Sequence, residues 1–327
     1  MLSVFLEPGG GRLMTRVVDV PRPGKGEVLI KVHASPVNPT DLAKIKEMNP
    51  EEAEGFIPGT EGSGMVVATG AGILPRLFKG KRVAFAAKHR YSGAWAEYVV
   101  TPAGSCFPIS KKVSDEQASM AIVNPMTALA FLDYARQYRQ LAVVSTVAGG
   151  ALGRMVTGIL EKKGIRVLNI VRSEKSMREL REGGAREILS SETDDFAEKL
   201  AGWCQDNKAG LILDAIGGEF VNRVIDHLPP NTVILLYGNL SQKQVEFMPQ
   251  QLLRKHNGIV GFFLGEWVAR QGMLKTIRRL MKVNRLLKHG METKVQATFS
   301  LQDINKAIEV YEKDMSGGKA ILMPKHE

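Results

Sequence analysis

The chain has 327 residues, of which 44% are hydrophobic, and it carries a formal net charge of +10. No apolar run approaches the ~20 residues that a membrane-spanning helix needs. Its two cysteines, Cys106 and Cys204, are too few for a disulfide-rich secreted protein or a four-cysteine zinc lobe. The basic balance favours an anionic ligand, without choosing among a nucleotide, coenzyme A and nucleic acid.

The N-terminus and the cysteine usage bear on the compartment. The first residues, MLSVFLEPGGGR, lack the basic region and the small-residue cleavage site of a secretory signal. Because two cysteines without partner spacing suit a reducing compartment, we expect a cytoplasmic protein. An organelle lumen, reached with a transit peptide that is then removed, stays open. Basic and aromatic residues are not interleaved, so neither nucleic acid nor a membrane is an expected partner.

The first third of the chain is typical of a β-rich domain. Residues 12–20 and 28–33 alternate in polarity with period two, and a glycine and proline cluster between them marks a turn. A proline-stiffened loop follows at residues 35–41. Further short strands are expected at 65–69, 82–86 and 94–100. Many short strands with glycine corners predict a curved, partly closed sheet.

From Ser114 onward, helices and strands alternate. Ser114-x-x-Gln117 resembles a capping box that opens a helix, and residues 126–138 are a second helical stretch. Strands are expected at 141–145, 165–171, 187–190, 211–215, 233–238 and 259–264, with helices at 154–163, 174–182, 194–207, 219–228 and 249–255. This alternation predicts a doubly wound parallel sheet with helices on both faces.

The last elements are too few to form a domain. They are a helical stretch from Gly265 to about His289, a strand at 295–299, a helix to Asp314 and a strand at 319–323. We expect them to complete the N-terminal domain. The predicted fold class is therefore α/β, with a Rossmann dinucleotide-binding domain at residues 123–265 inserted into a β-rich domain of residues 1–122 and 266–327.

Residues 141–171 have the pattern and length of one strand, turn, helix and strand unit. The turn contains Gly150-x-x-Gly153, which supplies two of the three glycines of a dinucleotide fingerprint. Such a turn lets the backbone approach a pyrophosphate at the N-terminus of the helix. Gly150, Ala151, Leu152 and Gly153 are therefore candidate cofactor contacts, with tight packing as the alternative role of the glycines.

The residue at the end of the second strand bears on which cofactor is bound. NAD sites place an Asp or Glu there, about twenty residues after the turn, to bond the ribose 2′-hydroxyl. This chain has Arg172, followed by Glu174 and Lys175. A guanidinium suits a 2′-phosphate, so Arg172 and Lys175 predict NADPH. The alternative is a solvated strand end, with Glu174 as the displaced acid.

Short motifs follow one another along the whole chain. They are Val37-Asn38-Pro39-Thr40-Asp41, Pro58-Gly59-x-Glu61-Gly62, Gly80-Lys81-Arg82-Val83, Trp95-Ala96-Glu97-Tyr98, Asn124-Pro125-Met126-Thr127-Ala128, Asp214-Ala215-Ile216-Gly217-Gly218, Tyr237-Gly238 and Gly318-Lys319-Ala320. In this order they resemble the medium-chain dehydrogenase/reductase superfamily. The resemblance implies a GroES-like catalytic domain around the Rossmann domain.

Within that superfamily, the chain is most similar to the zinc-independent quinone oxidoreductases and 2-enoyl thioester reductases. The zinc enzymes use a catalytic Cys and His set, whereas here the loop carries Asn38 to Asp41, and Thr60 stands where a metal-binding His would follow glycine. No metal site is expected. The resemblance implies an NADPH-dependent reductase that transfers a hydride to an activated C=C of an enoyl thioester or enone. A quinone substrate and a non-catalytic NADPH-binding regulatory protein are the alternatives.

The resemblance also implies roles for individual residues. Asn38, Asn124 and Thr127 would lie near the nicotinamide and donate to the substrate oxygen that gathers negative charge. The cofactor cleft would be lined by Asp214, Tyr237, Asn239, Phe262, Phe263 and Leu264. Trp95 and Trp267 would line an apolar substrate pocket. The alternative is that the asparagines stabilise turns beside prolines and that the aromatic residues are ordinary core.

The chain departs from the enoyl reductases at the proton donor. Those enzymes carry a tyrosine shortly after the N-P-x-D loop, and residues 45–50 contain none. Tyr91, from another loop, or water would have to serve instead.

Two further segments bear on the interactions of the chain with partners. Residues 267–291 contain no acidic residue and seven Lys and Arg residues, which predicts a solvated basic face, or else a landing site for an acidic partner or for the phosphates of an acyl carrier. The resemblance further implies a homodimer, formed by an exposed strand after Leu252.

Overall fold

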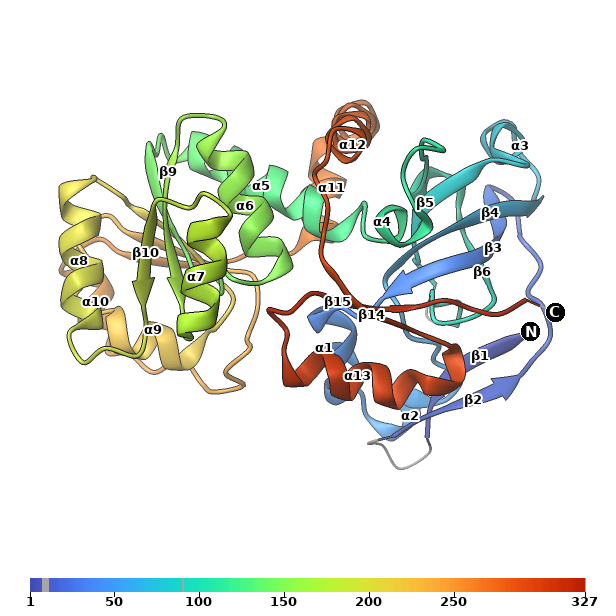
Figure 1. The fold of residues 1–327 in the computed structure, drawn as a ribbon, viewed down its shortest axis with the longest axis horizontal. Coiled ribbons are helices and arrows are strands. Elements are labelled where there is room, and N and C mark those ends of the chain that lie inside the picture. The colour runs from blue at the N-terminus through green and yellow to red at the C-terminus, as the bar shows by residue number, and fades with distance from the viewer. Residues whose placement is uncertain (8–11, 90, 327) are drawn as a thin grey trace. The chain divides into compact units, whose positions relative to one another are not determined.

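The computed structural model describes residues 1–7, 12–89 and 91–326, so residues 8–11 of the start considered above lie outside the description. The chain divides into two compact units, residues 1–125 with 277–327, and residues 126–276 (Figure 1). The boundaries fall inside the helices α5 (Val123–Gln137) and α12 (Met273–Lys288), which run from one unit into the other. The assignment of catalytic and nucleotide-binding roles to residues 1–122 with 266–327 and to 123–265 stays a prediction.

The first unit is built on a seven-stranded sheet. Its strands run in the order β14 (Val295–Phe299), β15 (Lys319–Leu322), β3 (Glu27–Pro36), β4 (Glu61–Thr69), β5 (Arg82–Ala86) and β7 (Cys106–Pro108), and β6 (Tyr98–Pro102) also pairs with β3. A separate pair consists of β1 (Leu2–Leu6) and β2 (Leu13–Val17). Since Ile321 and Leu322 pair with Pro36 and Ser35, the end of the chain joins a strand formed near its start.

Short helices surround this sheet. They are α1 (Pro39–Glu47), α2 (Pro50–Ala53), α3 (Ile73–Phe78), α4 (Asp115–Ser119) and α13 (Ile304–Lys313), with 3₁₀ turns at Ala103–Ser105 and Leu301–Asp303. Alternate residues of β3, Val28, Ile30 and Val32, are completely buried and pack in one apolar cluster with Phe85 and Val99. The period-two pattern of the sequence therefore marks the buried face of this strand.

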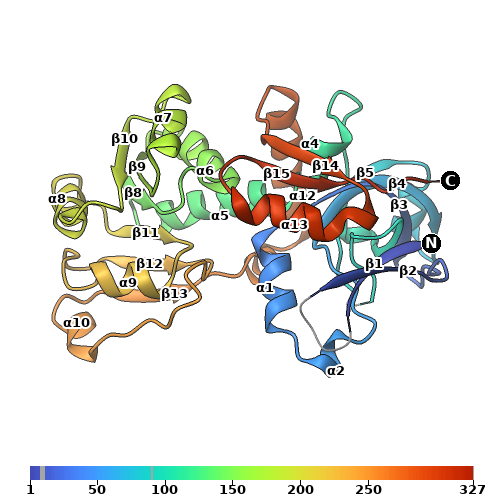
Figure 2. The same ribbon diagram turned by 60° about the horizontal axis from the view of Figure 1, so that its bottom comes forward.

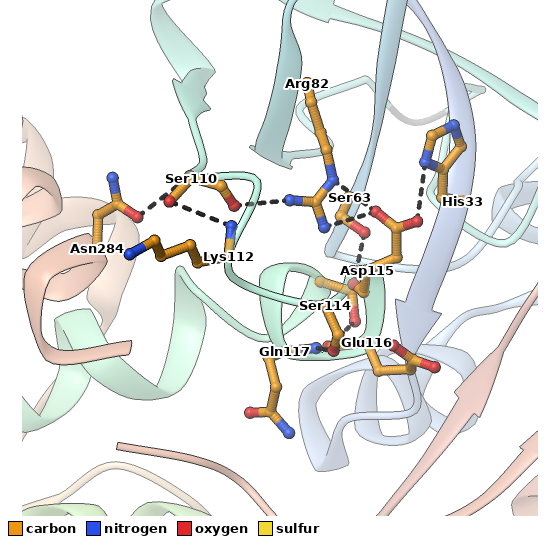
Figure 3. Close-up of polar contacts among 11 residues, drawn as sticks. His33, Ser63, Arg82, Ser110, Lys112, Ser114, Asp115, Glu116, Gln117 and Asn284 are labelled. Atoms are coloured by element: carbon orange, nitrogen blue, oxygen red, sulfur yellow. Dashed lines mark hydrogen bonds and ion pairs between the residues drawn. The ribbon is translucent and has the colours of Figure 1, made fainter. Parts of the chain in front are cut away.

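A polar network ties α4 to the sheet. Asp115, the first residue of α4, lies between His33 on β3, whose Nδ1 is 3.2 Å away, and Arg82 on β5, whose Nε donates at 2.7 Å (Figure 3). Ser63 on β4 donates to the Asp115 carbonyl at 2.7 Å. A carboxylate at a helix N-terminus is also favoured by the helix dipole, so one residue fixes α4 against three strands.

The second unit holds six parallel strands. They lie in the order β10 (Glu187–Ser190), β9 (Arg166–Val171), β8 (Ala142–Ser145), β11 (Leu211–Asp214), β12 (Val233–Leu236) and β13 (Gly258–Gly261). In chain order this is 3-2-1-4-5-6, the arrangement of a Rossmann fold. The helices α6 (Ala151–Glu161), α7 (Glu174–Glu182), α8 (Phe196–Asp206), α9 (Gly218–Val224) and α10 (Pro249–Leu253) flank it (Figure 2), and α11 (Leu264–Gln271) follows its last strand in the chain. The predicted α/β fold class is confirmed.

Several predicted elements were wrong in extent. The single helix expected after Gly265 is two helices, α11 and α12, because Gly272 between them takes a φ of 73°. The strand expected at 94–100 begins only at Tyr98. Ala94 and Trp95 instead donate their backbone N–H groups to Gly59 and Pro58, across a loop. The strand β1 and the helix α3 were not predicted. Within the described ranges, no helix is long and apolar enough to cross a membrane.

Candidate functional site

The glycine turn after β8 leads directly into α6, with Gly150 as the N-cap. Residues 148–151 read Ala-Gly-Gly-Ala and carry no side chain larger than a methyl group; Ala148 and Gly149 are buried, whereas Gly150 and Ala151 are half-buried. A Cβ on Gly153 would lie 2.5 Å from the Ala148 Cα, so only glycine lets the helix pack this closely on the turn. The cradle therefore fits the pyrophosphate of a dinucleotide at the helix N-terminus.

Arg154 of α6 connects the turn to α7. Its Nε donates to the Gly149 carbonyl at 2.8 Å, and its Nη2 pairs with Glu179 on α7. A Cβ on Gly149 would lie 3.0 Å from Ser176 of α7, so the turn and the first turn of α7 are neighbours. These contacts fix the cradle on the side of β9.

Arg172 follows β9 immediately and is exposed, as is Lys175 in the first turn of α7. Ser173 caps α7 by accepting from the Ser176 N–H at 3.2 Å. The residues predicted from the fingerprint and the basic residues predicted to hold a 2′-phosphate thus lie on adjacent loops of the second unit.

Asp214, the last residue of β11, bonds to Thr146, which follows β8; these are the two central strands, where the strand order reverses. It is completely buried and accepts from the Thr146 hydroxyl at 2.8 Å and from the backbone N–H groups of Ile216 and Gly217 at 3.0 and 2.9 Å. Burial raises the pKa of this carboxyl. Through these bonds Asp214 holds the loop after β11 in place.

Of the remaining residues predicted to bind the cofactor, some pack against other side chains and one is largely exposed. Tyr237 and Phe262 both pack against Phe131 of α5, with ring centroids 4.8 and 5.2 Å away. Asn239 lies beside Gly217, where a Cβ would be 2.7 Å from its Oδ1. Phe263 is 70% exposed, and Leu264 is half-buried at the start of α11.

Asn38, the N-cap of α1, lies in a buried polar cluster of the first unit. Its side chain is 1% exposed, and its Nδ2 donates to Glu61 Oε1 at 3.0 Å. Lys319 of β15 donates from Nζ to Asn38 Oδ1 at 2.6 Å, and also to the Val37 carbonyl at 3.2 Å. The amide of Asn38 is therefore held at both ends by charged groups.

Glu61 connects this cluster to the start of α5. Its Oε2 accepts from the backbone N–H groups of Ile122 and Val123 at 3.2 and 2.9 Å. Asn124 and Thr127 lie one and four residues beyond Val123, three apart on one face of α5, and both are buried. Burial raises the pKa of Glu61 and lowers that of Lys319. One carboxylate thus positions the helix that carries two predicted catalytic residues.

Beside this cluster lies a cavity of about 190 Å³. Asp41 and Thr60 line it, together with Lys44, Phe56 and His89. The Thr60 hydroxyl donates to Asp41 Oδ1, and the Asn38 backbone N–H donates to Asp41 Oδ2 at 3.0 Å. Burial raises the pKa of Asp41 to about 6.

The other predicted site residues are placed less directly. Trp95 is completely buried in the core of the first unit and donates from Nε1 to the Pro36 carbonyl at 3.2 Å, which matches the core alternative. Trp267 is 7% exposed on α11. Tyr91 is 64% exposed, with its ring beside Gly55.

The sequence alone does not identify four residues of the cluster as site residues: Asp41, Thr60, Glu61 and Lys319. The sequence did carry a signal for Lys319, since it stands at the head of the apolar run Ala320-Ile321-Leu322, where a lysine needs a buried partner. The identity of that partner depends on β15 pairing with β3.

Comparison with known families adds to this geometry. The alcohol dehydrogenase GroES-like domain matches residues 24–111, and the zinc-binding dehydrogenase domain matches residues 151–282. The chain belongs to the medium-chain dehydrogenase/reductase superfamily. In the described parts of this superfamily member, no three His, Cys, Asp or Glu side chains are grouped to hold a metal ion.

Individual members of the superfamily are similar over most of their length. The mitochondrial enoyl-[acyl-carrier-protein] reductase of Arabidopsis thaliana is 27% identical over 288 residues, 85% of this chain and 75% of that protein. A proposed NADPH:quinone reductase from Mesorhizobium loti is 29% identical, with a TM-score of 0.88 over 99% of this chain and 98% of that one. A mycobacterial protein whose structure contains NADPH has the same fold, with 22% identity and a TM-score of 0.81 over 99% and 100% of the two chains.

Proposed function

We propose that the protein is a zinc-independent, NADPH-dependent reductase that adds a hydride to the activated C=C of an enoyl thioester or an enone. The observation that carries the proposal is the Ala-Gly-Gly-Ala turn at the start of α6, on which the helix packs closely through Gly153, with the exposed Arg172 on the adjacent loop. The similarity to an enoyl reductase and to a proposed quinone reductase supports this class of acceptor.

The second unit would bind the cofactor. The N-terminal N–H groups of α6 would hold the pyrophosphate, while Arg172 and Lys175 would hold the 2′-phosphate. Asp214 would keep the loop after β11 in the conformation that receives the cofactor. When bound, a dihydronicotinamide supplies the hydride, which needs no metal.

The first unit would orient the acceptor. Glu61 and Lys319 hold the Asn38 amide in one orientation, and the hydrogen bond to Glu61 uses one of the two hydrogens on Nδ2. Because Asn38 is 1% exposed, we assign it a positioning role: with Glu61 and Lys319 it fixes the start of α1, whose Asp41 lines the cavity.

The test is oxidation of NADPH and of NADH with crotonyl-coenzyme A, an alkyl enone and a naphthoquinone as acceptors. Turnover of the first two with NADPH is expected. Turnover of the naphthoquinone alone would favour the quinone reductase alternative. If NADPH binds and no acceptor is reduced, the protein is a non-catalytic NADPH-binding module.

A further inference from the structure

The structure suggests a source for the proton that the missing tyrosine would supply. We propose that Thr60 and Asp41, which line the cavity of the first unit and are hydrogen-bonded to each other, protonate the substrate α-carbon. The inference rests on the proposed reductase function. Thr60 is the donor, and Asp41 restores its proton.

The contacts of Asp41 exceed what its place in the helix requires. At the third position of α1, its Oδ2 accepts the backbone N–H of the N-cap Asn38, which is one half of a capping box. Its Oδ1 is then left for the Thr60 hydroxyl, and both side chains line the cavity. A carboxyl that only capped the helix would need neither the hydroxyl nor the cavity.

The step balances with one hydride and one proton. When the hydride has formed the new C–H bond at the β-carbon, the former π pair is spread over the α-carbon and the carbonyl oxygen. That pair takes the Thr60 hydroxyl proton and forms the α C–H bond. As the Thr60 O–H bond breaks, the protonated Asp41 passes its proton to Thr60 Oγ1. Asp41 is left as a carboxylate and regains a proton from water.

The charges around Asp41 suit this role. Its pKa of about 6 results from burial, opposed by the Thr60 and Asn38 hydrogen bonds and by Lys319 on β15. Tyr311 on α13 and Glu61 on β4 also contact Lys319 or Asn38, and Lys44 and His89 line the cavity. As a carboxylate, Asp41 accepts from Thr60. Once protonated it can donate to Thr60 Oγ1, which frees the Thr60 hydrogen for the substrate.

The experiment uses an enone with an α-methyl group, because its reduction creates a stereocentre at the protonated carbon. With NADPH, the wild type should give mainly one enantiomer. Thr60→Val should lower kcat by about 100-fold or more and give nearly equal amounts of both enantiomers, since water then protonates either face. Thr60→Ser should retain the enantiomer ratio. A merely structural role for Thr60 would not alter that ratio.

Thr101→Val is the matched control, because it removes a threonine hydroxyl of the same unit that donates only to the Ala86 carbonyl, at 2.7 Å. It should leave the enantiomer ratio unchanged. In Asp41→Asn, the decline of kcat as pH rises through about 6 should disappear.

The outcomes separate the two hypotheses. Retention of rate and enantiomer ratio in Thr60→Val overturns the proton donor but leaves the reductase intact. Loss of the ratio in Tyr91→Phe instead assigns the proton to Tyr91 and also overturns the proposal. A wild type that reduces no acceptor overturns the proposed function and the donor together.

Discussion

At the scale of single residues, Lys319 supplies the positive charge that compensates the buried carboxyls of Glu61 and Asp41. Its ammonium lies among Asn38, Tyr311 and the carboxyls of Glu61 and Asp41, where burial alone would be costly for each charge. The bonds to Asn38 and Val37 also hold β15 against the loop that precedes α1. Removing this one cation leaves two carboxyls without their common partner.

Lys319→Met should therefore destabilise the protein strongly. We expect a loss of about 3–5 kcal/mol in the free energy of unfolding, because an uncompensated buried charge remains. Urea unfolding measures it, with the exposed Lys306→Met on α13 as the control, which should change little. Adding Glu61→Gln should recover part of the loss. If Lys319→Met loses no more stability than Lys306→Met, Lys319 does not compensate the buried carboxyls.

Arg172 is the residue that should select the cofactor. Arg172→Ala is expected to raise the Kd for NADPH by about tenfold or more while leaving the Kd for NADH nearly unchanged, because a charge-assisted bond to the 2′-phosphate is lost. Isothermal titration measures both constants. Arg181→Ala, an exposed arginine in the last turn of α7, serves as the control. Equal affinities for the two nucleotides in the wild type would defeat the role assigned to Arg172.

Asp115 should make stability depend on pH in the acid range. The hydrogen bond from His33, and then that from Arg82, lower its pKa below 3.8, whereas burial opposes them. A lowered folded-state pKa contributes stability that is present above the unfolded value and is lost as pH falls through the folded value. Asp115→Asn should cost about 1 kcal/mol at neutral pH, reduced by the partial exposure of the side chain. The difference in unfolding free energy from the wild type should shrink in acid. A difference that grows on acidification would contradict this.

At the scale of elements, α6 shows how one glycine sets a packing distance. Gly153 lets the helix approach Ala148, whereas a Cβ added to Gly158 on the same helix would point into open space. Gly153→Ala should destabilise the protein by about 1–3 kcal/mol and weaken nucleotide binding, because the turn must move. Gly158→Ala should stabilise it by up to about 1 kcal/mol, since glycine is a poor helix former. Thermal unfolding with and without NADPH compares the two, and similar effects of both variants would refute the packing argument.

Elements were predicted best where one local pattern decides them. The alternation of apolar and polar residues located β3, because burial of one face imposes a period of two, and the continuous apolar run of residues 165–171 located β9, which is buried on both faces. The break between α11 and α12 was missed, because a helical pattern continues on both sides of Gly272 and only its positive φ ends the helix. Similarly, residues 94–97 have strand composition, but they divide their backbone bonds between the Pro58-Gly59 loop and β1 and form no regular strand.

At the scale of the whole molecule, the edge strand β13 bears on assembly. Among the residues that the structure describes it pairs with β12 alone, and it ends the six-stranded sheet. An edge strand offers unpaired backbone groups to a second chain, so we expect a homodimer formed through β13. Light scattering should give twice the 35.9-kDa mass of the chain. The mass of a single chain would rule out this assembly at the concentration measured.

The sequence by itself determined the fold class, because the alternation of helices and strands after Ser114 and the turn before α6 are local patterns. It also located Arg172 at a strand end, and Asn38 in its loop. Only the tertiary structure decided what Asn38 contacts. Lys319 is 281 residues away from it and reaches it because β15 pairs with β3. The cavity beside Asp41 and Thr60 likewise depends on loops that meet only after folding, since local periodicity carries no information about which distant residues share a buried charge.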